Sequence, residues 1–370
     1  MSRTRVIEVV ECGGPGGTGN QVAAIVRGLD RSRFEVSLAY AVRSGTPEDF
    51  ERSCGGRSQE TDFFHIPEMA REIGPLRDMK AWLRLYRLFR ELSPDVVHAH
   101  SSKAGFLART AAWAAGVPKV LYSPRGYAFQ MLDRSALSRA RYRALEASVS
   151  WIGTVAACSE SEAALARGLP FARVCVARDA YLGELPTGSP SQEGFPVVAA
   201  SGRMSFPRNP EAFVTLAKRL CDSRKGVRCL WIGGGELEDP MREQIGDLDL
   251  EDKLEATGWL PHKEALARLK TASIFVHYSR WEGLPNSVLE AMALGLPVVA
   301  SALPSNRELV RPGENGFLAK PEAELHARVL ALIDDAPLRL RMGKAGRALV
   351  EKEYRLPRLL AELSALYSGS

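Results

Sequence analysis

Short apolar runs alternate with segments of helical periodicity along the whole chain. In the first half, the runs at 6–10, 35–40 and 120–123 are each followed by a polar or glycine-rich loop. Most of these loops lead into a segment whose apolar positions recur three or four residues apart, and the same order returns at 196–200 and 229–232. Because strands that alternate with helices indicate parallel sheets, the pattern predicts an α/β chain.

A segment rich in glycine, proline and serine, residues 184–195, interrupts this repeat and reads as a linker. With 370 residues, 45% of them apolar, the chain is long enough for two ordinary cores. We therefore expect two doubly wound, Rossmann-like parallel sheets, in domains 1–183 and 196–352, that face each other across a cleft. Residues 44–62 are polar and glycine-rich, and we expect a loop there.

Composition narrows the setting of the protein. Six cysteines are scattered without a Cys-x-x-Cys pair, so neither a zinc site nor a disulfide framework is indicated, and a reducing cytoplasm fits best. The run at 6–10 is too short and too interrupted by acids for a signal peptide, and no stretch approaches the length of a membrane span. The net charge of +5 divides into about +6 for residues 1–182 and about −1 for the remainder. We expect a soluble protein with no nucleic-acid partner, whose first half faces something anionic.

The stretch from Tyr278 to Ser301 concentrates two acids, a glycine turn and a helix start. Glu282 follows the apolar run at 273–277 and precedes Gly283, which predicts a position at the carboxyl end of a strand. A glycine at such a point lets a ligand approach the backbone closely.

The helix after this turn is expected over 287–294, with Asn286 or Ser287 as its cap and Glu290 on its first turn. A helix amino terminus is an anion site, and acids beside it can accept hydrogen bonds from sugar or ribose hydroxyls. Glu290 taken alone is explained equally well as a carboxylate that complements the helix dipole.

Two cations lie on one predicted strand-to-helix loop in the second half. Arg203 and Arg208 follow the strand at 196–200 and precede a helix. Each could be a surface cation, but together, ahead of the acid pair, they favour a contact with phosphate.

A glycine-rich turn follows the first strand. Gly14, Gly16 and Gly19 satisfy the spacing G-x-G-x-x-G of dinucleotide-binding loops. A nicotinamide site would want an acid at the end of the second strand, which ends in Ala41-Val-Arg instead. A purely structural turn remains the alternative.

Two further loops follow the strands at 94–100 and 120–123, at the sheet edge where open α/β sheets bind ligands. Histidines at strand ends, such as His98 and His100, are more often structural than catalytic. Arg125 on the second loop is a candidate phosphate or carboxylate contact.

The segment 76–92 has helical period and interleaves arginines, among them Arg84, Arg87 and Arg90, with large apolar residues. This pattern is compatible with a basic face for an anionic membrane surface. An ordinary surface helix with solvated arginines is the alternative.

The string EGLPNSVLE, with AMALGLPVVAS after it, resembles the acid, seven residues, acid signature of the retaining glycosyltransferases of family 4. The resemblance covers most of the chain and is strongest between Ser201 and Phe317. It implies the GT-B fold, in which the first domain, 1–183, receives the acceptor and the second, 196–352, binds the nucleotide sugar. The last helix, within 353–370, returns to the first domain in that fold. The chain departs from the family where a His-Gly pair is usual, since Arg125-Gly126 stands there, and it lacks an Asn-Gly pair near Asp179.

The resemblance also implies roles for residues. Glu282 would hold the sugar ring and Glu290 the ribose, while Arg203 and Arg208 would grip the donor diphosphate. The remaining donor contacts that it implies are Gly16 and Gly17 from the first domain, Trp259 and Leu260 at the nucleobase, and Gly283, Leu284, Asn286, Ser287 and Val288 around the phosphates. Trp259 could equally be an apolar anchor.

These expectations combine into a retaining hexosyltransferase-type enzyme. It would move a sugar from a nucleotide diphosphate sugar, most simply a UDP-sugar, to a hydroxyl of a saccharide or lipid-linked saccharide in cell-surface polysaccharide or glycan assembly. The arginines and helix amides could stabilise the leaving group, so we expect neither a metal nor a bound cofactor. Localisation would be cytoplasmic, with peripheral contact to the inner face of the membrane. A GT-B sugar-nucleotide epimerase and a non-catalytic sugar-nucleotide sensor are the alternatives.

Overall fold

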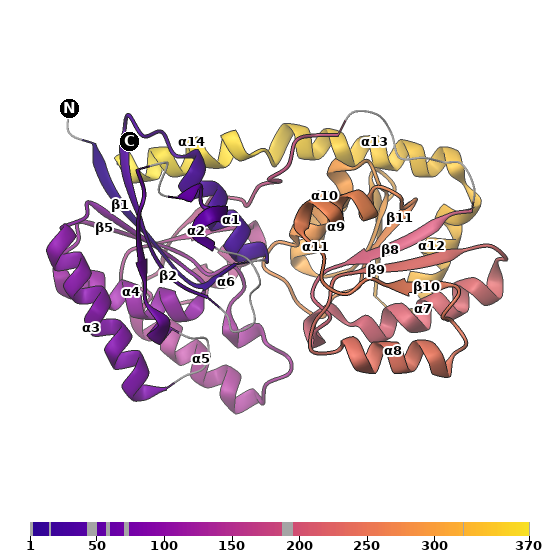
Figure 1. Ribbon diagram of the computed structural model, residues 1–370, viewed down its shortest axis with the longest axis horizontal. Helices are drawn as coiled ribbons and strands as arrows, with labels where there is room; N and C mark the ends of the chain where they lie inside the picture. Colours follow the sequence, from indigo (N-terminus) through magenta and orange to yellow (C-terminus); the bar gives the residue numbers. More distant parts are fainter. Residues whose placement is uncertain are drawn as a thin grey trace. The chain divides into compact units, whose positions relative to one another are not determined.

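The computed structural model divides the chain into two compact units, described separately below (Figure 1). Unit 1 comprises residues 1–182 and 356–370, and unit 2 comprises residues 183–355. The structure describes residues 3–14, 16–42, 50–56, 60–69, 74–186, 195–320 and 322–369. Most of the segment expected as a linker, residues 187–194, lies outside the described residues.

Unit 1 is built on a seven-stranded, wholly parallel sheet of order β3-β2-β1-β4-β5-β6-β7. The order reverses between β1 and β4, which makes the carboxyl ends of these two strands the switch point where ligands bind in such folds. The strands are β1 (Thr4–Gly13), β2 (Phe34–Val42), β3 (Asp62–His65), β4 (Val96–His100), β5 (Lys119–Ser123), β6 (Thr154–Ala157) and β7 (Arg173–Val176).

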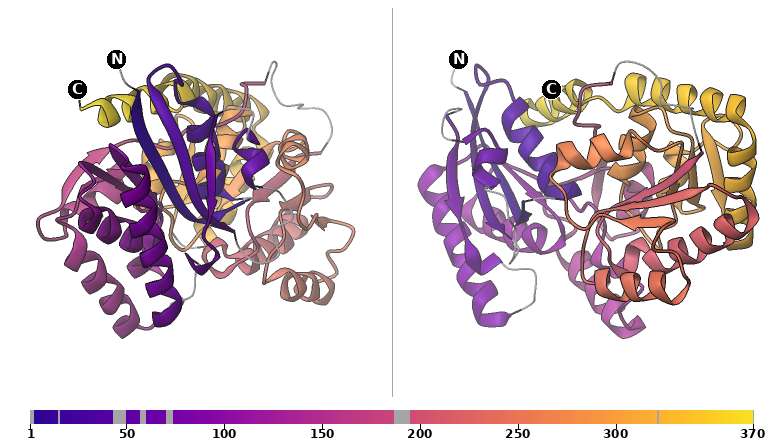
Figure 2. Two further views of the ribbon diagram at one scale, coloured as in Figure 1. Left: turned by 60° about the vertical axis from the view of Figure 1, so that its left-hand side comes forward. Right: turned by 45° about the vertical axis from the view of Figure 1, so that its right-hand side comes forward.

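Two apolar layers cover the faces of this sheet. Alternate strand residues such as Val9 and Ala99 point into a core that includes Leu85 of α3 and Leu107 of α4. The other face carries Val10 and packs on helices α1 and α14, which lie side by side (Figure 2). The helices are α1 (Gly17–Gly28), α2 (Phe50–Ser53), η2 (Pro67–Met69), α3 (Pro75–Leu92), α4 (Ser102–Ala115), η3 (Ala128–Gln130), α5 (Ala136–Val149), α6 (Glu160–Arg167) and α14 (Leu356–Ser368).

Unit 2 repeats the plan with a six-stranded parallel sheet of order β10-β9-β8-β11-β12-β13. Its order reverses between β8 and β11. The strands are β8 (Val197–Ser201), β9 (Arg228–Ile232), β10 (Leu254–Ala256), β11 (Ile274–His277), β12 (Val298–Ser301) and β13 (Gly316–Ala319).

Helices α7, α8 and α12 share one core with the sheet of unit 2, through residues such as Phe213, Met241 and Val329. Helices α10 and α13 pack against each other, and Gly343 of α13 comes so close to the backbone of Gly295 that a Cβ there would collide with it. The helices are η4 (Phe206–Arg208), α7 (Pro210–Ser223), α8 (Glu238–Asp247), α9 (His262–Leu269), α10 (Asn286–Ala293), α11 (Pro304–Leu309), α12 (Glu322–Asp334) and α13 (Ala336–Glu353).

The expected α/β architecture of two doubly wound parallel sheets is confirmed. The loop expected over 44–62 is corrected where the structure describes it, because the short helix α2 and the start of β3 lie there. Phe50 and Cys54 are buried in this segment, and the Phe50 ring packs beside Tyr40. Polar composition concealed these two apolar anchors.

Candidate functional site

The carboxyl ends of β8 and β11 bring Arg208 and Glu282 together at the switch point of unit 2. Arg208 ends the short helix η4, and Asn209 after it has a left-handed backbone with φ of 57°. Nη1 of Arg208 forms an ion pair with Oε1 of Glu282, whose side chain is only 11% exposed. Burial raises the pKa of Glu282, but Arg208 and other partners outweigh it, so the pKa lies below its ordinary value. Glu282 is therefore an ionised acceptor held by a cation.

His277, the last residue of β11, joins this pair and was missed by the sequence analysis as a functional residue. Its Nε2 lies 3.4 Å from Oε1 of Glu282 and 3.5 Å from Nη1 of Arg208, and its Nδ1 lies 3.4 Å from Oγ of Ser287. Burial lowers the pKa of His277, so the ring is neutral. Its position at a strand end, five residues before Glu282, was the available signal.

Helix α10 begins one residue earlier than expected. Pro285 takes the N-cap position and makes no side-chain cap, so neither Asn286 nor Ser287 caps the helix. Glu290 is consequently its fifth residue and lies on the second turn, not the first. The N–H of Val288 donates to the Pro285 carbonyl at 3.0 Å. This amide, which was expected to contact a phosphate, is therefore already hydrogen-bonded within the helix start. Among the described residues, no partner accepts from the N–H of Ser287.

The second acid of the signature has a partner of its own. Oε1 of Glu290 lies 2.9 Å from Nε2 of His262, at the start of α9. His262 follows the loop that carries Trp259 and Leu260. Trp259 is 56% exposed, so it is not the buried apolar anchor considered as an alternative. Gly234 lies against Trp259, because a Cβ on Gly234 would come 2.8 Å from Cδ1 of the ring and 3.0 Å from the backbone nitrogen.

Arg203 lies on the same loop as Arg208 but in a more open setting. Its Nε bonds Oε2 of Glu236 at 2.9 Å, and both side chains are exposed, at 42% and 55%. The structure thus places Arg208 beside Glu282, whereas Arg203 forms a separate, solvent-exposed ion pair with Glu236. Gly283 and Leu284 lie on the turn between Glu282 and α10, and Leu284 is buried.

One Asp-x-Asp sequence, Asp247-Leu248-Asp249, closes helix α8. Both aspartates are exposed and precede β10, so they lie toward the amino ends of the strands. Arg208 and Glu282, the residues expected to contact the sugar donor, lie at the carboxyl ends of the strands instead.

In unit 1, the glycine turn after β1 has the conformation that only glycine adopts easily. Gly16 has φ of 136° and is the N-cap of α1, which begins at Gly17. A Cβ on Gly19 would lie 2.1 Å from the Gly14 carbonyl, so this position is closed to other residues. The turn is therefore both structurally required and open to a ligand at Gly16.

The loops after β4 and β5 each carry a non-glycine residue at positive φ near their start, 73° at Ser101 and 52° at Arg125. Such backbone strain concentrates at functional sites. Arg125 is not free to meet a ligand: its Nη1 pairs with Asp179, and its Nε lies 3.4 Å from Nδ1 of His100. Burial lowers the pKa of Arg125, but Asp179 and other acidic neighbours together outweigh it. The pKa therefore lies above its ordinary value and the guanidinium stays charged.

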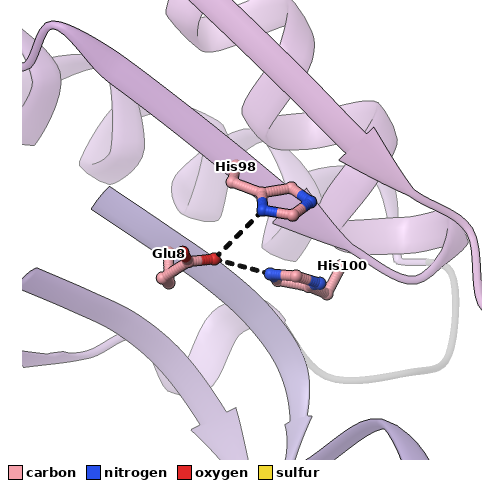
Figure 3. Close-up of side chains that lie close together, drawn as sticks. All are labelled: Glu8, His98 and His100. Carbon is pink, nitrogen blue, oxygen red and sulfur yellow. Dashed lines mark hydrogen bonds and ion pairs between the residues drawn. The ribbon is translucent and has the colours of Figure 1, made fainter. Parts of the chain in front are cut away.

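Glu8, His98 and His100 are fully buried on adjacent strands of unit 1, and both histidines approach one carboxylate (Figure 3). The expectation that the histidines are structural agrees with this burial, but Glu8 was overlooked. Within the described residues these three form the one group of histidine and acid donors close enough, within 4.8 Å, to surround a metal ion.

Helix α3 buries Ala81, Leu85 and Phe89 and leaves Leu76 and Met79 exposed. Arg84 pairs with Glu68 at 2.8 Å but stays 48% exposed, and Arg87 and Arg90 are exposed as well, so both alternatives for this helix stay predictions. No described helix has the length and apolar character to cross a membrane.

The excess positive charge of the first half falls at residues 101–150, which hold eight lysines and arginines against two acids. Helix α5 lies there with little buried surface: Leu137 and Leu145 are 62% and 44% exposed, and Arg141 is exposed on the same face. Arg134 is exposed just before the helix. Helix α5 therefore presents a basic and apolar surface, and α3 presents another through Leu76, Met79 and its exposed arginines.

Comparisons with known proteins agree across both units. Residues 184–349 match the family model of glycosyl transferases group 1, and residues 16–179 match that of the glycosyl transferase 4-like domain. The UDP-Gal:alpha-D-GlcNAc-diphosphoundecaprenol alpha-1,3-galactosyltransferase of Escherichia coli is 27% identical over 334 residues, 82% of this chain and 83% of that protein. The amylovoran biosynthesis glycosyltransferase AmsK of Erwinia amylovora is 37% identical over 137 residues, 33% of this chain and 32% of that protein.

Solved structures share the fold over the full length. Anabaena Alr3699/HepE, in complex with UDP and glucose, has a TM-score of 0.80 at 17% identity and covers 100% of both chains. Sucrose-phosphate synthase from Thermosynechococcus elongatus has a TM-score of 0.80 at 17% identity and covers 99% of both.

Proposed function

Because this chain belongs to the family 4-type glycosyltransferases of GT-B fold, we propose that it transfers a hexose from a UDP-sugar to a lipid-linked saccharide with retention of configuration. The observation that carries the proposal is the cluster of Arg208, Glu282 and His277 at the switch point of unit 2. A cation beside a buried carboxylate suits a ligand that combines phosphates with sugar hydroxyls.

The donor diphosphate is the group that Arg208 serves in this proposal. Its guanidinium is 25% exposed and can form charge-assisted hydrogen bonds with phosphate oxygens. The amide of Ser287 at the start of α10 adds a dipole of the same sign. Charge that develops on the departing diphosphate would then be stabilised by the protein itself, without a metal.

The sugar ring is the proposed ligand of Glu282. When Arg208 turns to the diphosphate, Glu282 loses a donor and can accept hydrogen bonds from sugar hydroxyls instead. Neutral His277 can donate from Nε2 to the same carboxylate and keep it in place, with Nδ1 accepting from Ser287. Glu290 and His262 would take the ribose, beside Trp259 and Leu260 at the base.

Retention does not require a covalent nucleophile in this scheme. The acceptor hydroxyl would attack the face of the sugar from which the diphosphate departs, and the departing oxygen would take the proton of that hydroxyl. The bond from the anomeric carbon to phosphate oxygen breaks, and a bond from the same carbon to the acceptor oxygen forms.

The acceptor is proposed to be lipid-linked because the E. coli relative, which matches over 334 residues, is named for a diphosphoundecaprenol acceptor. Helix α5 offers Arg141 and exposed leucines for an anionic membrane surface, and Arg134 lies just before the helix. Contact with that surface would bring the enzyme to its acceptor.

Product analysis tests the proposal. The full chain is incubated with a panel of UDP-sugars, with and without a polyprenyl-diphosphate saccharide, and products are separated by mass spectrometry. We expect a new glycolipid only when both substrates are present. Conversion of the sugar nucleotide without acceptor would favour an epimerase, and donor binding without turnover across the acceptors would favour a sensor.

A further inference from the structure

A polar cluster is buried in the apolar face of unit 1 that packs on α1 and α14. Glu8 is on β1, His98 and His100 are on β4, Ser123 ends β5, and Tyr367 comes from α14; each is at most 3% exposed. Period-two alternation places the strand residues on the face that carries the apolar residues Val6, Val10, Val96 and Leu121. Polar atoms in such surroundings must satisfy each other.

The two ends of the cluster fix the direction of its hydrogen bonds. Oγ of Ser123 donates its single hydrogen to the Ala156 carbonyl at 2.7 Å, so Nε2 of His98, 3.0 Å away, must donate to Ser123. At the other end Nε of Arg125 can only donate, so Nδ1 of His100 accepts. A neutral His100 then carries its hydrogen on Nε2 and donates to Oε2 of Glu8 at 2.6 Å.

Tyr367 closes the chain between these ends. Its hydroxyl oxygen lies 2.7 Å from Nδ1 of His98 and 2.7 Å from Oε1 of Glu8. Tyrosine has one hydrogen for these two contacts, so a second hydrogen must come from Glu8 as a carboxylic acid or from His98 as an imidazolium. The cluster therefore holds one further proton, shared between Glu8 and His98, besides the protons whose positions are already fixed by the hydrogen bonds.

Burial decides where that proton resides. Placing it on His98 creates a cation and a carboxylate with no access to water, whereas placing it on Glu8 leaves both groups uncharged. Burial also raises the pKa of Glu8 and lowers that of His98 well below its ordinary value. The neutral arrangement has every donor and acceptor paired.

A metal ion fits this geometry less well than a proton. Ligand atoms about 2.0–2.1 Å from one metal stand roughly 3 Å or more apart. Nε2 of His100 and Oε2 of Glu8 are 2.6 Å apart, which is a hydrogen-bond length.

We propose that Glu8 is a protonated, uncharged acid and that Glu8, Tyr367, His98 and His100 form one hydrogen-bonded chain that positions Arg125. Arg125 is the second residue of the loop at 124–127 and has a left-handed conformation, and its second partner, Asp179, neutralises it. The C-terminal helix thereby becomes part of the support of this loop. The kinetic consequence rests on the proposed function, with the acceptor placed on unit 1 as the family resemblance implies; the protonation state does not.

Three variants of the full chain separate the possibilities. Glu8→Gln copies the protonated acid, because its amide can donate to Tyr367 and its carbonyl can accept from His100. Glu8→Leu removes both contacts, and Tyr367→Phe breaks the chain at its centre. We expect Glu8→Gln to melt within about 3 °C of the wild type and the other two to lose more than about 5 °C. An equal loss for Glu8→Gln and Glu8→Leu would show an ionised Glu8 and overturn the proposal.

Two measurements that need no substrate support the thermal comparison. The ¹⁵N chemical shifts of the His98 and His100 rings should report neutral Nε2–H tautomers that do not titrate between about pH 6 and 8. Elemental analysis of purified protein should find no stoichiometric metal, and a bound metal that Glu8→Gln abolishes would contradict the chain. These results stand even if the proposed transfer fails.

The positioning role is read from kinetics. Once transfer is established, Tyr367→Phe and Glu8→Leu should each raise the acceptor KM by about fivefold or more, while the donor KM stays within about twofold of the wild-type value. Glu8→Gln should keep the acceptor KM of the wild type. Unchanged acceptor KM in Tyr367→Phe would refute positioning.

Discussion

Replacing Glu282 by glutamine separates the sugar from the phosphates. In the free protein Arg208 is engaged by Glu282, and the donor diphosphate must compete with that pair. Glutamine keeps the shape but removes the charge. Turnover should fall by about 100-fold or more, because a group that contacts the reacting sugar is changed. The affinity for UDP itself should not fall.

The magnitude follows from the exposure of the pair. A hydrogen bond to a charged group contributes about 1.5–3 kcal/mol. Since Arg208 is 25% and Glu282 11% exposed, water screens the pair in part, and we take a value just below that range, about 1.4 kcal/mol. Release of that interaction corresponds to at most about tenfold tighter UDP binding.

Isothermal calorimetry with UDP and a transfer assay measure the two quantities on the same preparation. Glu236→Gln is the matched control, because it frees Arg203 from a solvated pair and should change the Kd by no more than about twofold. If Glu282→Gln weakened UDP tenfold or more, the carboxylate would belong to the nucleotide site and the assignment to the sugar would be wrong.

Four further outcomes follow from the same structure. Arg208→Ala should weaken UDP by roughly 2–3 kcal/mol, or about 30- to 160-fold by calorimetry, whereas Arg203→Ala, which changes a solvated cation, should cost severalfold at most; equal losses would contradict the burial argument. The pKa of Glu282 is held below its ordinary value of 4.5, so its ionised form stabilises the folded protein fully above that pH, and this stabilisation is lost as pH falls through the lower folded value. Thermal melts from about pH 6 to 3 should therefore show a steeper decline of the melting temperature for the wild type than for Glu282→Gln. Parallel curves would refute the ion pair with Arg208. Wild-type protein should sediment with anionic vesicles at low salt, less so after Arg134→Gln with Arg141→Gln than after the control pair Lys225→Gln with Lys344→Gln; no sedimentation of the wild type would leave a soluble acceptor as the better account. Transfer should survive excess EDTA, and a complete loss that manganese or magnesium restores would overturn the metal-free leaving-group step.

The architecture was accessible from sequence because strand and helix patterns repeat on both sides of residues 184–195. Apolar runs and the glycine turns after them predict parallel strands, and the structure has them. The ends of helices were harder to predict. Helix α10 begins at Asn286 because Pro285 occupies the N-cap position, and the sequence alone does not show which residue takes that position. Short elements such as α2 were hidden by polar neighbours.

The site was predictable where a motif names its members and opaque where contacts are distant in sequence. Arg208 and Glu282, both singled out from the sequence, form an ion pair, but His277 joins them only because β11 lies beside β8 in the sheet. The partners of Arg125 and Glu8 lie 54 and 359 residues away, at Asp179 and Tyr367. Spacing along the chain carries no signal for such pairs.

The configuration of the transferred sugar tests the central claim most directly. Purified protein is given an α-linked UDP-sugar and a polyprenyl-diphosphate saccharide, and the product is analysed by ¹H NMR at the anomeric position. We predict a new α-glycosidic linkage on the acceptor that disappears with Glu282→Gln. A β-linkage would contradict retention, and the absence of any glycosylated product across the donor and acceptor panels would contradict transfer itself.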